Sequence, residues 1–355
     1  MARALQLAAR GLTTTSPNPR VGCVLMRDGR ILGEGWHARA GEPHAEIHAL
    51  RAAGSAARGA TAYVTLEPCS HHGRTPPCAD ALIEAGVARV VSAMEDPNPL
   101  VAGQGMARLR AAGVITEHGL LATEAHELNI GFVSRMSRGR PWVRLKAAAT
   151  LDGKTALNNG VSQWITGPAA RADGHRWRAR ACAILTGIGT VREDDPQLTV
   201  RDVPCSRQPL RVLVDATLAV SPEARILQGE PILIATASAD AARMHALRAR
   251  GHEVLVLPNT AGKVDLPQLM TELGTRSLNE VHVEAGFKLN GSLMREGCVD
   301  ELLLYLAPML VGDAAQGLFN LPELASLQGA TRLDVRDLRT IGPDLRLIAR
   351  LRPAG

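Results

Sequence analysis

The stretches PHAEIH at residues 43–48 and LEPCSHHGRTPPC at residues 66–78 decide how the N-terminal half of this chain folds. They supply one imidazole, His44, and two thiols, Cys69 and Cys78. One imidazole and two thiolates form a ligand set that holds zinc tetrahedrally and leaves its fourth position for water, as in catalytic sites. Zinc lowers the pKa of such a water toward about 7, which makes hydroxide available at neutral pH. The two stretches therefore predict a catalytic zinc site.

Glu46 is the carboxylate that we expect to move protons at this metal. Residues two apart on a regular helix point about 200° away from one another, so the spacing from His44 to Glu46 does not by itself bring them together. If His44 is the entry residue of the helix, however, Glu46 can reach across the first turn. The pattern H-x-E with P-C-x-x-C is the signature of zinc-dependent base deaminases, in which the Glu is the general acid and base and not a ligand.

The spacing of the cysteines departs from that signature, because eight residues instead of two separate Cys69 from Cys78. The alternative interpretations are a structural zinc site, a pair of buried thiols, and a metal pair formed by His44 and His48 one turn apart. A zincin is excluded because its pattern requires Glu directly after the first His, where this chain has Ala45. The combined segment favours a catalytic deaminase zinc over these alternatives.

The composition describes a globular protein with two domains. A chain of 355 residues exceeds the roughly 100 to 200 residues of one typical core. Apolar residues make up 46% of the chain, but no apolar run approaches the roughly 20 residues that cross a bilayer, so we expect no membrane segment. The N-terminus lacks a secretory signal pattern, and six cysteines in such a chain indicate reduced thiols, so we expect a cytoplasmic protein.

The charge pattern argues against a nucleic-acid partner. The net charge of +5 comes from 40 basic and 35 acidic residues, without a run of five or more Lys or Arg. Aromatic residues make up only 3% of the chain, which leaves few platforms on which bases could stack. We therefore expect a small anionic ligand and no nucleic acid.

Strand and helix signals alternate along the chain in two separate series, which predicts two α/β domains, the first with a largely parallel sheet. In residues 1–140 we expect a hairpin about Asp28-Gly29 and a closing helix over TEAHELNIGFVSRM at 123–136. Residues 141–355 hold the second series, with strands expected at PWVRLKAAAT, ACAILTG, LRVLVDA, PILIATA, HEVLVLP, NEVHVEAG and ELLLYLAP. We place the boundary near Arg140.

The N-terminal motifs resemble the deaminase half of the bifunctional deaminase/reductase family of riboflavin biosynthesis. PHAEIHAL and EPCSHHGRTPPC carry the resemblance, the long insert between the cysteines included, together with SPNPRVGCVL at 16–25 and EDPNP at 95–99. It implies a cytidine-deaminase-like three-layer α/β/α domain and the substrate 2,5-diamino-6-(5-phosphoribosylamino)pyrimidin-4-one. The substrate-binding residues that it implies, with Arg74 as the phosphate partner, are Asn18, His37, His71, Arg74, Asp96 and Asn98.

Residues 141–355 resemble the reductase half of the same family nearly to the C-terminus. The resemblance is carried by RLKAAATLDGKTAL at 144–157, GVSQWITG at 160–167, ILTGIGTVREDDPQLTVR at 184–201 and VEAGFKLNGSL at 283–293. It implies a dihydrofolate-reductase-like α/β domain with NADPH as cofactor. Glycine after a strand lets backbone amides approach a phosphate, but neither Gly-bearing loop is GxGxxG, so a Rossmann fingerprint is absent.

The resemblance also implies the residues of the reductase site. Those that would line the NADPH site are Ala148, Trp164, Thr190, Asp194, Gly286, Phe287, Lys288, Leu289, Asn290, Gly291 and Ser292. Those that would face the ribosylaminopyrimidine, with the two arginines as phosphate clamps, are Ser162, Arg178, Leu198, Arg201 and Glu284. The implied reaction is hydride transfer to C1′ of the ring-opened ribosyl group. Its candidate acid is Lys146, Asp152 or neither, since the LDG turn at 151–153 could bind the cofactor instead.

We therefore expect a homo-oligomer that deaminates its substrate at zinc and then reduces the ribosyl group with NADPH. The rival hypotheses are a nucleic-acid base editor and a zinc-stabilised binding module. Scarce aromatics count against the first, and Glu46 beside a three-ligand zinc counts against the second. The four remaining cysteines have no assigned role, and we expect them to be buried as small apolar residues: Cys23, Cys182, Cys205 and Cys298.

Overall fold

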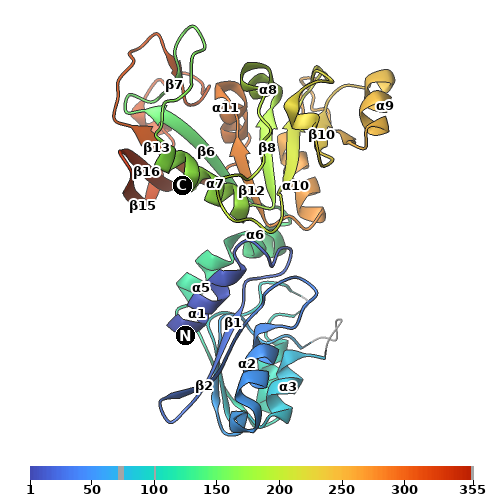
Figure 1. Cartoon of the computed structure of the whole chain (residues 1–355), viewed down its shortest axis with the longest axis vertical. Coiled ribbons are helices and arrows are strands. Elements are labelled where there is room, and N and C mark those ends of the chain that lie inside the picture. Colours follow the sequence, from blue (N-terminus) through green and yellow to red (C-terminus); the bar gives the residue numbers. More distant parts are fainter. Residues whose placement is uncertain (71–75, 100, 353–355) are drawn as a thin grey trace. The chain divides into compact units, whose positions relative to one another are not determined.

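Two large sheets with separate apolar cores organise the chain (Figure 1). The computed structural model describes residues 1–70, 76–99 and 101–352. It separates into unit 1, Met1–Gly139, and unit 2, Arg140–Gly355. Among the described residues, unit 1 contains a five-stranded sheet, and unit 2 contains a nine-stranded sheet and a two-stranded one.

The sheet of unit 1 combines an antiparallel half with a parallel half. In sheet order its strands are β2 (Arg30–Trp36), β1 (Gly22–Arg27), β3 (Thr61–Val64), β4 (Arg89–Ser92) and β5 (Ile115–His118). Strand β1 is antiparallel to both β2 and β3, whereas β3, β4 and β5 run parallel. The hairpin turns at Asp28 and Gly29, both at positive φ, as the Asp-Gly pair predicts. The expectation of a largely parallel sheet is wrong for this unit, because the hairpin and its partner β3 make half of the sheet antiparallel.

Helices cover both faces of this sheet, which confirms the expected three-layer α/β/α arrangement. They are α1 (Ala2–Ala8), α2 (Ala45–Ala53), α3 (Cys78–Glu84), α4 (Gln104–Ala111), α5 (Ala122–Leu128) and α6 (Ile130–Arg138). On one face, Val24 of β1 packs against Ala4 and Leu7 of α1. On the other, Cys23 and Leu25 belong to a core shared with α2, α3 and α4. The alternation of side chains along β1 thus separates the two layers of helices.

Helix α2 lies against the β1–β2 hairpin at backbone distance. A Cβ atom at Gly33 would lie 2.2 Å from the carbonyl oxygen of Ala49, and one at Gly35 would lie 2.1 Å from that of Ala45. Only glycine permits this approach, because any side chain would collide with the helix backbone. Since α2 begins directly after His44, the contact fixes where its first turn lies.

The single helix expected over 123–136 is two helices, α5 and α6, which break at Asn129. The Asn129 side chain accepts the backbone N–H of Arg20 at 2.7 Å and donates to the Arg20 carbonyl oxygen at 2.9 Å. These bonds tie the break to the segment before β1, and such side-chain bonds compete with helical continuation.

All seven apolar stretches predicted as strands in the second half are strands of one sheet. In sheet order its members are β11 (Glu253–Val256), β10 (Leu233–Thr236), β9 (Leu210–Val214), β8 (Ala183–Gly187), β12 (Glu280–Glu284), β6 (Trp142–Thr150), β13 (Glu301–Ala307), β16 (Asp344–Leu351) and β15 (Leu333–Ile341). The first seven run parallel, and β16 and β15 add an antiparallel hairpin to β13. Strands β7 (Lys154–Ala156) and β14 (Gln316–Gly317) form the small sheet.

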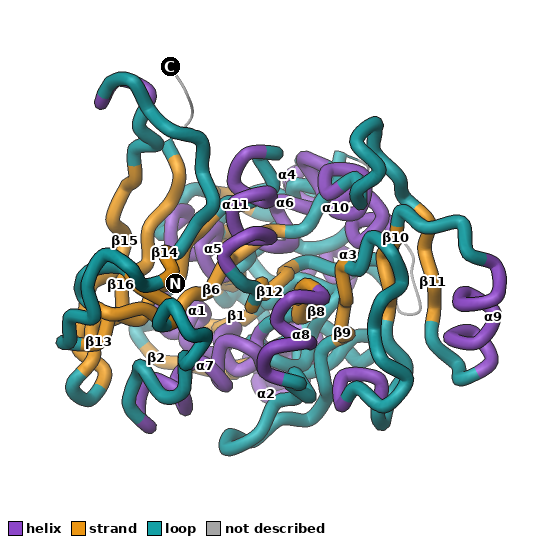
Figure 2. The backbone as a smooth tube through the Cα atoms, turned by 90° about the horizontal axis from the view of Figure 1, so that it is seen from above, coloured by secondary structure: helices purple, strands orange, loops and turns teal. Residues whose placement is uncertain are grey.

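Helices also cover both faces of the large sheet. They are α7 (Pro168–Arg180), α8 (Ile188–Asp194), α9 (Ala241–Ala249), α10 (Leu266–Thr275) and α11 (Phe287–Arg295). The main core joins α10 and α11 to one face, and smaller cores join α7, α8 and α9 to the other. Figure 2 shows β15 and β11 at opposite ends of this sheet.

A charged layer lies between helix α7 and the sheet. Alternate residues of β12 face this side, because Val281 and Val283 belong to the core beneath α10 and α11. The fully buried Glu280 accepts from Arg144 Nη1 at 3.1 Å and from Arg180 Nε at 2.8 Å. Arg144 also pairs with Glu301 at 2.5 Å. The arginines of α7 and β6 thus hold the helix to the sheet through shared carboxylates.

We expect Glu280→Leu to lower the free energy of unfolding of unit 2 by about 3 to 5 kcal/mol, because it removes the buried carboxylate that Arg144 and Arg180 share and leaves Arg144 with Glu301. Urea unfolding followed by tryptophan fluorescence measures this loss, since three of the four tryptophans lie in unit 2. Glu253→Leu removes the partner of the more exposed Arg276 and should cost less than about 1 kcal/mol. Equal losses in the two variants would contradict a structural role for the buried network.

Candidate functional site

Three side chains that could hold a metal ion meet at the starts of two helices in unit 1. His44 is the N-cap of α2, Cys69 follows β3, and Cys78 is the first residue of α3. The Nδ1 atom of His44 lies 3.6 Å from Sγ of Cys69 and 3.3 Å from Sγ of Cys78, and the three ligand atoms all lie within 4.8 Å of one another. One imidazole and two thiols at these distances fit a tetrahedral zinc ion with one position left for water.

The two thiols of this cluster are electrostatically coupled. Hydrogen bonds from the Cys78 thiol and from His44 lower the pKa of Cys69. The backbone N–H of Cys78 also donates to Sγ of Cys69 at 3.3 Å. The pKa of Cys78 is raised, because its thiol is the donor to Cys69. Such a pair of thiols is suited to a metal, since metal binding releases the ligand protons.

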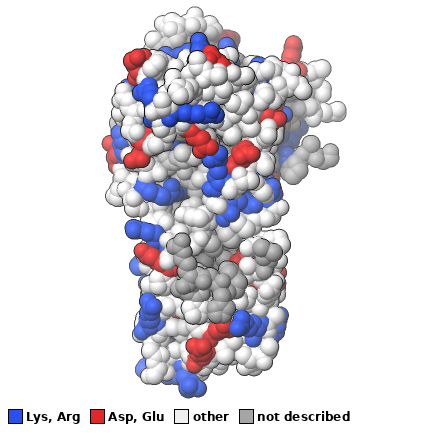
Figure 3. Space-filling model, turned by 90° about the vertical axis from the view of Figure 1, so that its right-hand side faces the viewer, with Lys and Arg blue, Asp and Glu red and all other residues white. Residues whose placement is uncertain are grey.

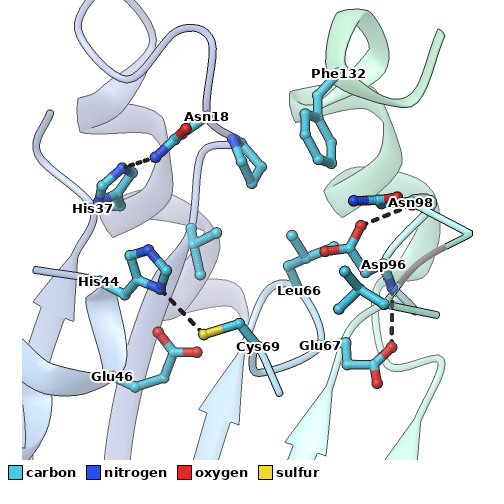
Figure 4. Close-up of a pocket in the computed structure, with 13 residues that line it drawn as sticks. Asn18, His37, His44, Glu46, Leu66, Glu67, Cys69, Asp96, Asn98 and Phe132 are labelled. Carbon is cyan, nitrogen blue, oxygen red and sulfur yellow. Dashed lines mark hydrogen bonds between the residues drawn. The ribbon is translucent and has the colours of Figure 1, made fainter. Parts of the chain in front are cut away.

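Glu46 lies in the first turn of α2, beside the metal cluster, and is buried. Burial raises its pKa to about 7, although the neighbouring His44 lowers it in part. Its Oε2 atom has no hydrogen-bond partner among the described residues. Buried polar atoms in proteins are normally bonded, so this oxygen marks a place where a ligand or water belongs. Figure 4 shows the carboxylate next to His44 and Cys69.

A cavity of about 230 Å³ opens beside the metal cluster and Glu46. Asp96 and Asn98 lie across this cavity from His44 (Figure 4). Four of the six residues expected to bind the deaminase substrate line it: Asn18, His37, Asp96 and Asn98. The other two, His71 and Arg74, lie outside the described residues.

His37 fixes the orientation of Asn18. Its Nδ1 lies 3.2 Å from the Pro43 carbonyl oxygen, and its Nε2 lies 3.1 Å from the side-chain nitrogen of Asn18. Burial lowers the pKa of His37, which favours the neutral ring. A neutral ring that donates from Nδ1 to the carbonyl oxygen accepts at Nε2, so the Asn18 amide must present its N–H to His37.

Glu67 and Phe132 also line the cavity, although neither is among the predicted site residues. Glu67 stands directly before Pro68-Cys69 and is buried. A charged residue between an apolar strand and a metal ligand is a signal in the sequence that could have identified it as a site residue. Phe132 lies on α6, where only the packing of that helix places it at the cavity. No local pattern in the sequence distinguishes it from a core residue.

In unit 2, the candidate site lies where the connections from two adjacent parallel strands diverge. After β8 the chain continues to β9, toward one edge of the sheet. After the neighbouring strand β12 it continues to β13, toward the opposite edge. In open α/β sheets, ligands bind in the crevice at the carboxyl ends of such strands. Helix α8 begins there after Gly187 and α11 after Gly286, and a Cβ at Gly286 would lie only 3.7 Å from Oγ1 of Thr190. Backbone amides at the start of α11 fit the phosphates of a dinucleotide.

Not all of the stretch from Gly286 to Ser292 faces this crevice, because its residues wind around α11. Asn290 is buried and donates to the Leu318 carbonyl oxygen at 3.3 Å. Gly291 packs against the backbone of Asn320, where a Cβ would lie 2.2 Å from the carbonyl oxygen. Asn290 and Gly291 thus pack against residues 318–320, and their contact with NADPH stays a prediction, as does that of the rest of the stretch.

Basic side chains from three elements surround Glu284, at the end of β12. Arg178 of α7 pairs with it through two nitrogens, with Nη2 at 2.8 Å from Oε2. Lys146 Nζ of β6 lies 4.0 Å from Oε2, and His282 Nε2 lies 3.2 Å from Oε1. Burial acts to raise the pKa of Glu284, but Arg178 and Lys146 hold it well below its usual range. Burial lowers the pKa of Lys146, and Glu284 offsets this in part.

The two arginines expected as phosphate clamps are in different situations. Arg178 directs its guanidinium at Glu284 and donates from Nη1 to the Thr199 carbonyl oxygen at 3.0 Å. Arg201 is exposed, and its Nη1 donates to the Thr199 hydroxyl at 3.2 Å. Its backbone N–H donates to Nδ1 of His175 at 3.1 Å. Of the two, Arg201 is the one placed to meet a phosphate from solvent.

The candidate acid Asp152 is already engaged by the protein. Its carboxylate accepts from the Thr150 hydroxyl and from the backbone N–H groups of Val311, at 3.1 Å, and Gly312, at 2.8 Å. The Thr150 bond and the backbone bonds lower its pKa. Asp152 therefore joins two loops, which leaves Lys146 as the better placed proton donor.

The remaining predicted residues of the reductase site differ in exposure and in their contacts. Leu198 is buried in a core cluster, so only its backbone can face a ligand. Trp164 is exposed and lies under the Arg171 guanidinium at 4.5 Å. Asp194 accepts from Gln163 at 3.4 Å. The other two, both partly buried, are Ala148 on β6 and Ser162.

Two family models match this chain, one in each unit. Residues 1–94 match the cytidine and deoxycytidylate deaminase zinc-binding region, and this range contains all three candidate metal ligands and Glu46. Residues 141–347 match the RibD C-terminal domain, and this range contains β8, β12 and the helices α8 and α11 that follow them. The confirmed fold class, a deaminase-like unit followed by a reductase-like unit, agrees with both matches.

Full-length relatives combine the same two units. The riboflavin biosynthesis protein RibD of Escherichia coli is 51% identical, over 98% of this chain and 97% of its own length. The solved structure of Acinetobacter baumannii RibD, form 1, is 42% identical with a TM-score of 0.92, and the match covers 99% of this chain and 97% of that one. A Thermotoga maritima protein described as a diaminohydroxyphosphoribosylaminopyrimidine deaminase/5-amino-6-(5-phosphoribosylamino)uracil reductase is 33% identical with a TM-score of 0.88, over 99% and 97%. With both units matched over nearly its whole length, this chain belongs to the RibD family.

Proposed function

We propose that this chain is a bifunctional enzyme of riboflavin biosynthesis. Unit 1 removes an amine hydrolytically from 2,5-diamino-6-(5-phosphoribosylamino)pyrimidin-4-one, and unit 2 reduces the ribosyl group of the product with NADPH. The observation that carries the proposal is the cavity of unit 1, where three metal ligands stand beside Glu46 and its unpartnered buried oxygen. The family of the chain supplies the identity of the heterocycle.

In the deamination, His44, Cys69 and Cys78 hold zinc, and bound zinc acidifies water so that a nucleophile is available at neutral pH. Glu46 is placed to accept a proton from the attacking water and to deliver it to the departing amine. Water adds its oxygen to the ring carbon, the carbon–nitrogen bond breaks, and ammonia leaves. The polar groups that hold the heterocycle in the cavity are Asn18, Asp96 and Asn98.

In the reduction, NADPH supplies a hydride to C1′ of the ring-opened ribosyl group. The first turn of α11 and Thr190 suit its phosphates. Lys146 is the donor that protonates the sugar as its ring opens, because its ammonium points into the same cluster as Glu284. Glu284 is held ionised by Arg178, so it can accept a hydrogen bond from a sugar hydroxyl.

The remaining surface and thiol features support a small-molecule enzyme of the cytoplasm. All six cysteines are free thiols, which suits a reducing compartment. Basic and acidic side chains are interspersed on the face shown in Figure 3, as expected for a protein without a nucleic-acid partner. Among the described residues, none of the helices combines the length and the apolar character that a bilayer crossing requires.

The deaminase assignment is tested by Glu46→Gln. Ammonia release from the phosphorylated diaminopyrimidine should fall by about a hundredfold or more, because the proton carrier is lost. Zinc content should stay at one ion per chain, and NADPH oxidation with the deaminated intermediate should be unchanged. Chelation of zinc from the wild-type chain should likewise stop only ammonia release. Full ammonia release by the variant, or deamination of RNA in place of the free pyrimidine, would contradict the assignment.

The reductase assignment is tested by Arg201→Gln. We expect the KM for the phosphorylated, deaminated substrate to rise about tenfold, because a charge-assisted bond to its phosphate is lost. The KM for NADPH should not change. Arg225→Gln is the matched control, because Arg225 is also exposed and its contact with Asp195 uses only the backbone N–H. An unchanged substrate KM in Arg201→Gln would remove Arg201 from the phosphate site.

We further propose that the chain is a homo-oligomer that associates through β15. This strand occupies an edge of the large sheet, and its Val335 and Leu338 side chains are 59% and 62% exposed. The segment before it adds Leu324 and Leu327, 53% and 83% exposed. An edge strand with exposed apolar residues favours pairing with a second copy.

Light scattering after size exclusion tests the oligomer. The double variant Val335→Lys, Leu338→Lys should be monomeric under conditions in which the wild-type chain is not, because it places charge in the apolar contact. Ile31→Lys, at a residue of unit 1 that is 51% exposed, should leave the oligomer intact. A monomeric wild-type chain at micromolar concentration would end this part of the proposal.

A further inference from the structure

Glu67 is a buried carboxylate that stands between the metal-binding turn and the opposite wall of the deaminase cavity. It follows β3 and precedes Pro68-Cys69, and its backbone N–H donates to the Met94 carbonyl oxygen at 3.0 Å. Its side chain is not part of the metal cluster. Figure 4 shows the carboxylate on the side of Asp96, across the cavity from His44.

Four backbone N–H groups donate to the two oxygens of this carboxylate. Oε2 accepts from Asp96 at 3.2 Å and from Gly103 at 2.9 Å. Oε1 accepts from Gly105 at 2.8 Å and from Met106 at 3.2 Å. N–H groups that donate to a buried carboxylate replace the hydrogen bonds that it would make to water. One side chain thereby holds the backbone at Asp96, Gly103, Gly105 and Met106.

The same contact begins helix α4. Gly103 is the N-cap of this helix, with φ of 75°, and no side chain at the cap bonds the first-turn amides. Glu67 supplies the acceptors that these amides require. The helix approaches so closely that a Cβ at Gly105 would lie 1.9 Å from the Pro68 carbonyl oxygen. The far wall of the cavity is therefore fastened directly to the metal-binding turn.

We propose that Glu67 is a positioning residue for the deamination, an inference that rests on the proposed function of unit 1. It sets the distance between the zinc ligand Cys69 and the substrate-facing residues Asp96 and Asn98. The two wall residues move together, because the Asn98 backbone N–H donates to Asp96 Oδ1 at 2.9 Å. Through them, Glu67 aligns the heterocycle with the metal and Glu46. A shift of about 1 Å in such a site is enough to lower the rate by roughly a hundredfold.

Three substitutions separate this role from general stability. Glu67→Gln preserves shape but replaces one accepting oxygen with an NH2 group that faces N–H donors, so two of the four bonds are lost. Glu67→Asp keeps the charge on a side chain too short to reach both groups of donors. Glu95→Gln is the matched control, because it removes the same charge from an exposed residue directly before Asp96.

The test measures ammonia release from the phosphorylated diaminopyrimidine by the full chain. Zinc content and NADPH oxidation with the deaminated intermediate are measured on the same preparations. We expect Glu67→Gln to raise the KM of the deaminase about tenfold or more, with zinc and reductase activity unchanged. Glu67→Asp should lie between Glu67→Gln and the wild type, and Glu95→Gln should match the wild type. Amide hydrogen exchange over 96–106 should be faster in Glu67→Gln alone.

Several results would overturn the role. Wild-type KM in Glu67→Gln, or loss of zinc from it, would show that Glu67 does not position the substrate wall, while the proposed function would stand. If unit 1 of Glu67→Gln fails to fold, a wild-type KM in Glu67→Asp would reject the role instead. A wild-type chain that releases no ammonia would instead reject the proposed function. In that case, unchanged amide hydrogen exchange over 96–106 in Glu67→Gln would still reject the positioning role of Glu67.

Discussion

A carboxylate taken out of water must find hydrogen-bond donors or cations, and both units are organised around glutamates under this constraint. Glu67 meets it with four backbone N–H groups, Glu280 with two arginines, and Glu284 with Arg178 and Lys146. Glu46 differs, because burial raises its pKa to about 7, whereas Arg178 and Lys146 hold the pKa of Glu284 well below its usual range. The glutamates with cationic or N–H partners hold elements together, and Glu46 is prepared to exchange a proton.

The two sites are built by different parts of α/β architecture. In unit 1, the site forms where α2 and α3 begin, so helix starts bring His44 and Cys78 together over a sheet that is only half parallel. In unit 2, the crevice forms where the connections from β8 and β12 part in a run of seven parallel strands. A shared phosphoribosyl-pyrimidine scaffold gives a chemical reason for both sites to occur in one chain, since the product of one is the substrate of the other.

Much of the fold and of the two candidate sites could be predicted, because the sequence patterns that indicate them are local. Buried parallel strands appear as continuous apolar runs, so all seven in unit 2 are visible in the sequence. The β15–β16 hairpin is not, because Arg and Asp interrupt its apolar residues. Contacts between residues distant in the sequence cannot be predicted from local patterns. Asn129 ends a helix by binding Arg20, 109 positions earlier. Likewise, the backbone donors that give Glu67 its role lie 29 to 39 positions away.

The late insertion of β12 between β8 and β6 has a consequence for biosynthesis of the protein. Strand β6 is the first strand of unit 2, yet both of its neighbours, β12 and β13, come from residues beyond 279. While the chain emerges from the ribosome, β6 must wait with both edges unpaired until those strands are made. Unit 1 contains all of its strands by then and is free to complete its sheet first. Pairing of the unpaired edges of β6 with a wrong strand is therefore the misfolding hazard that this topology creates during synthesis.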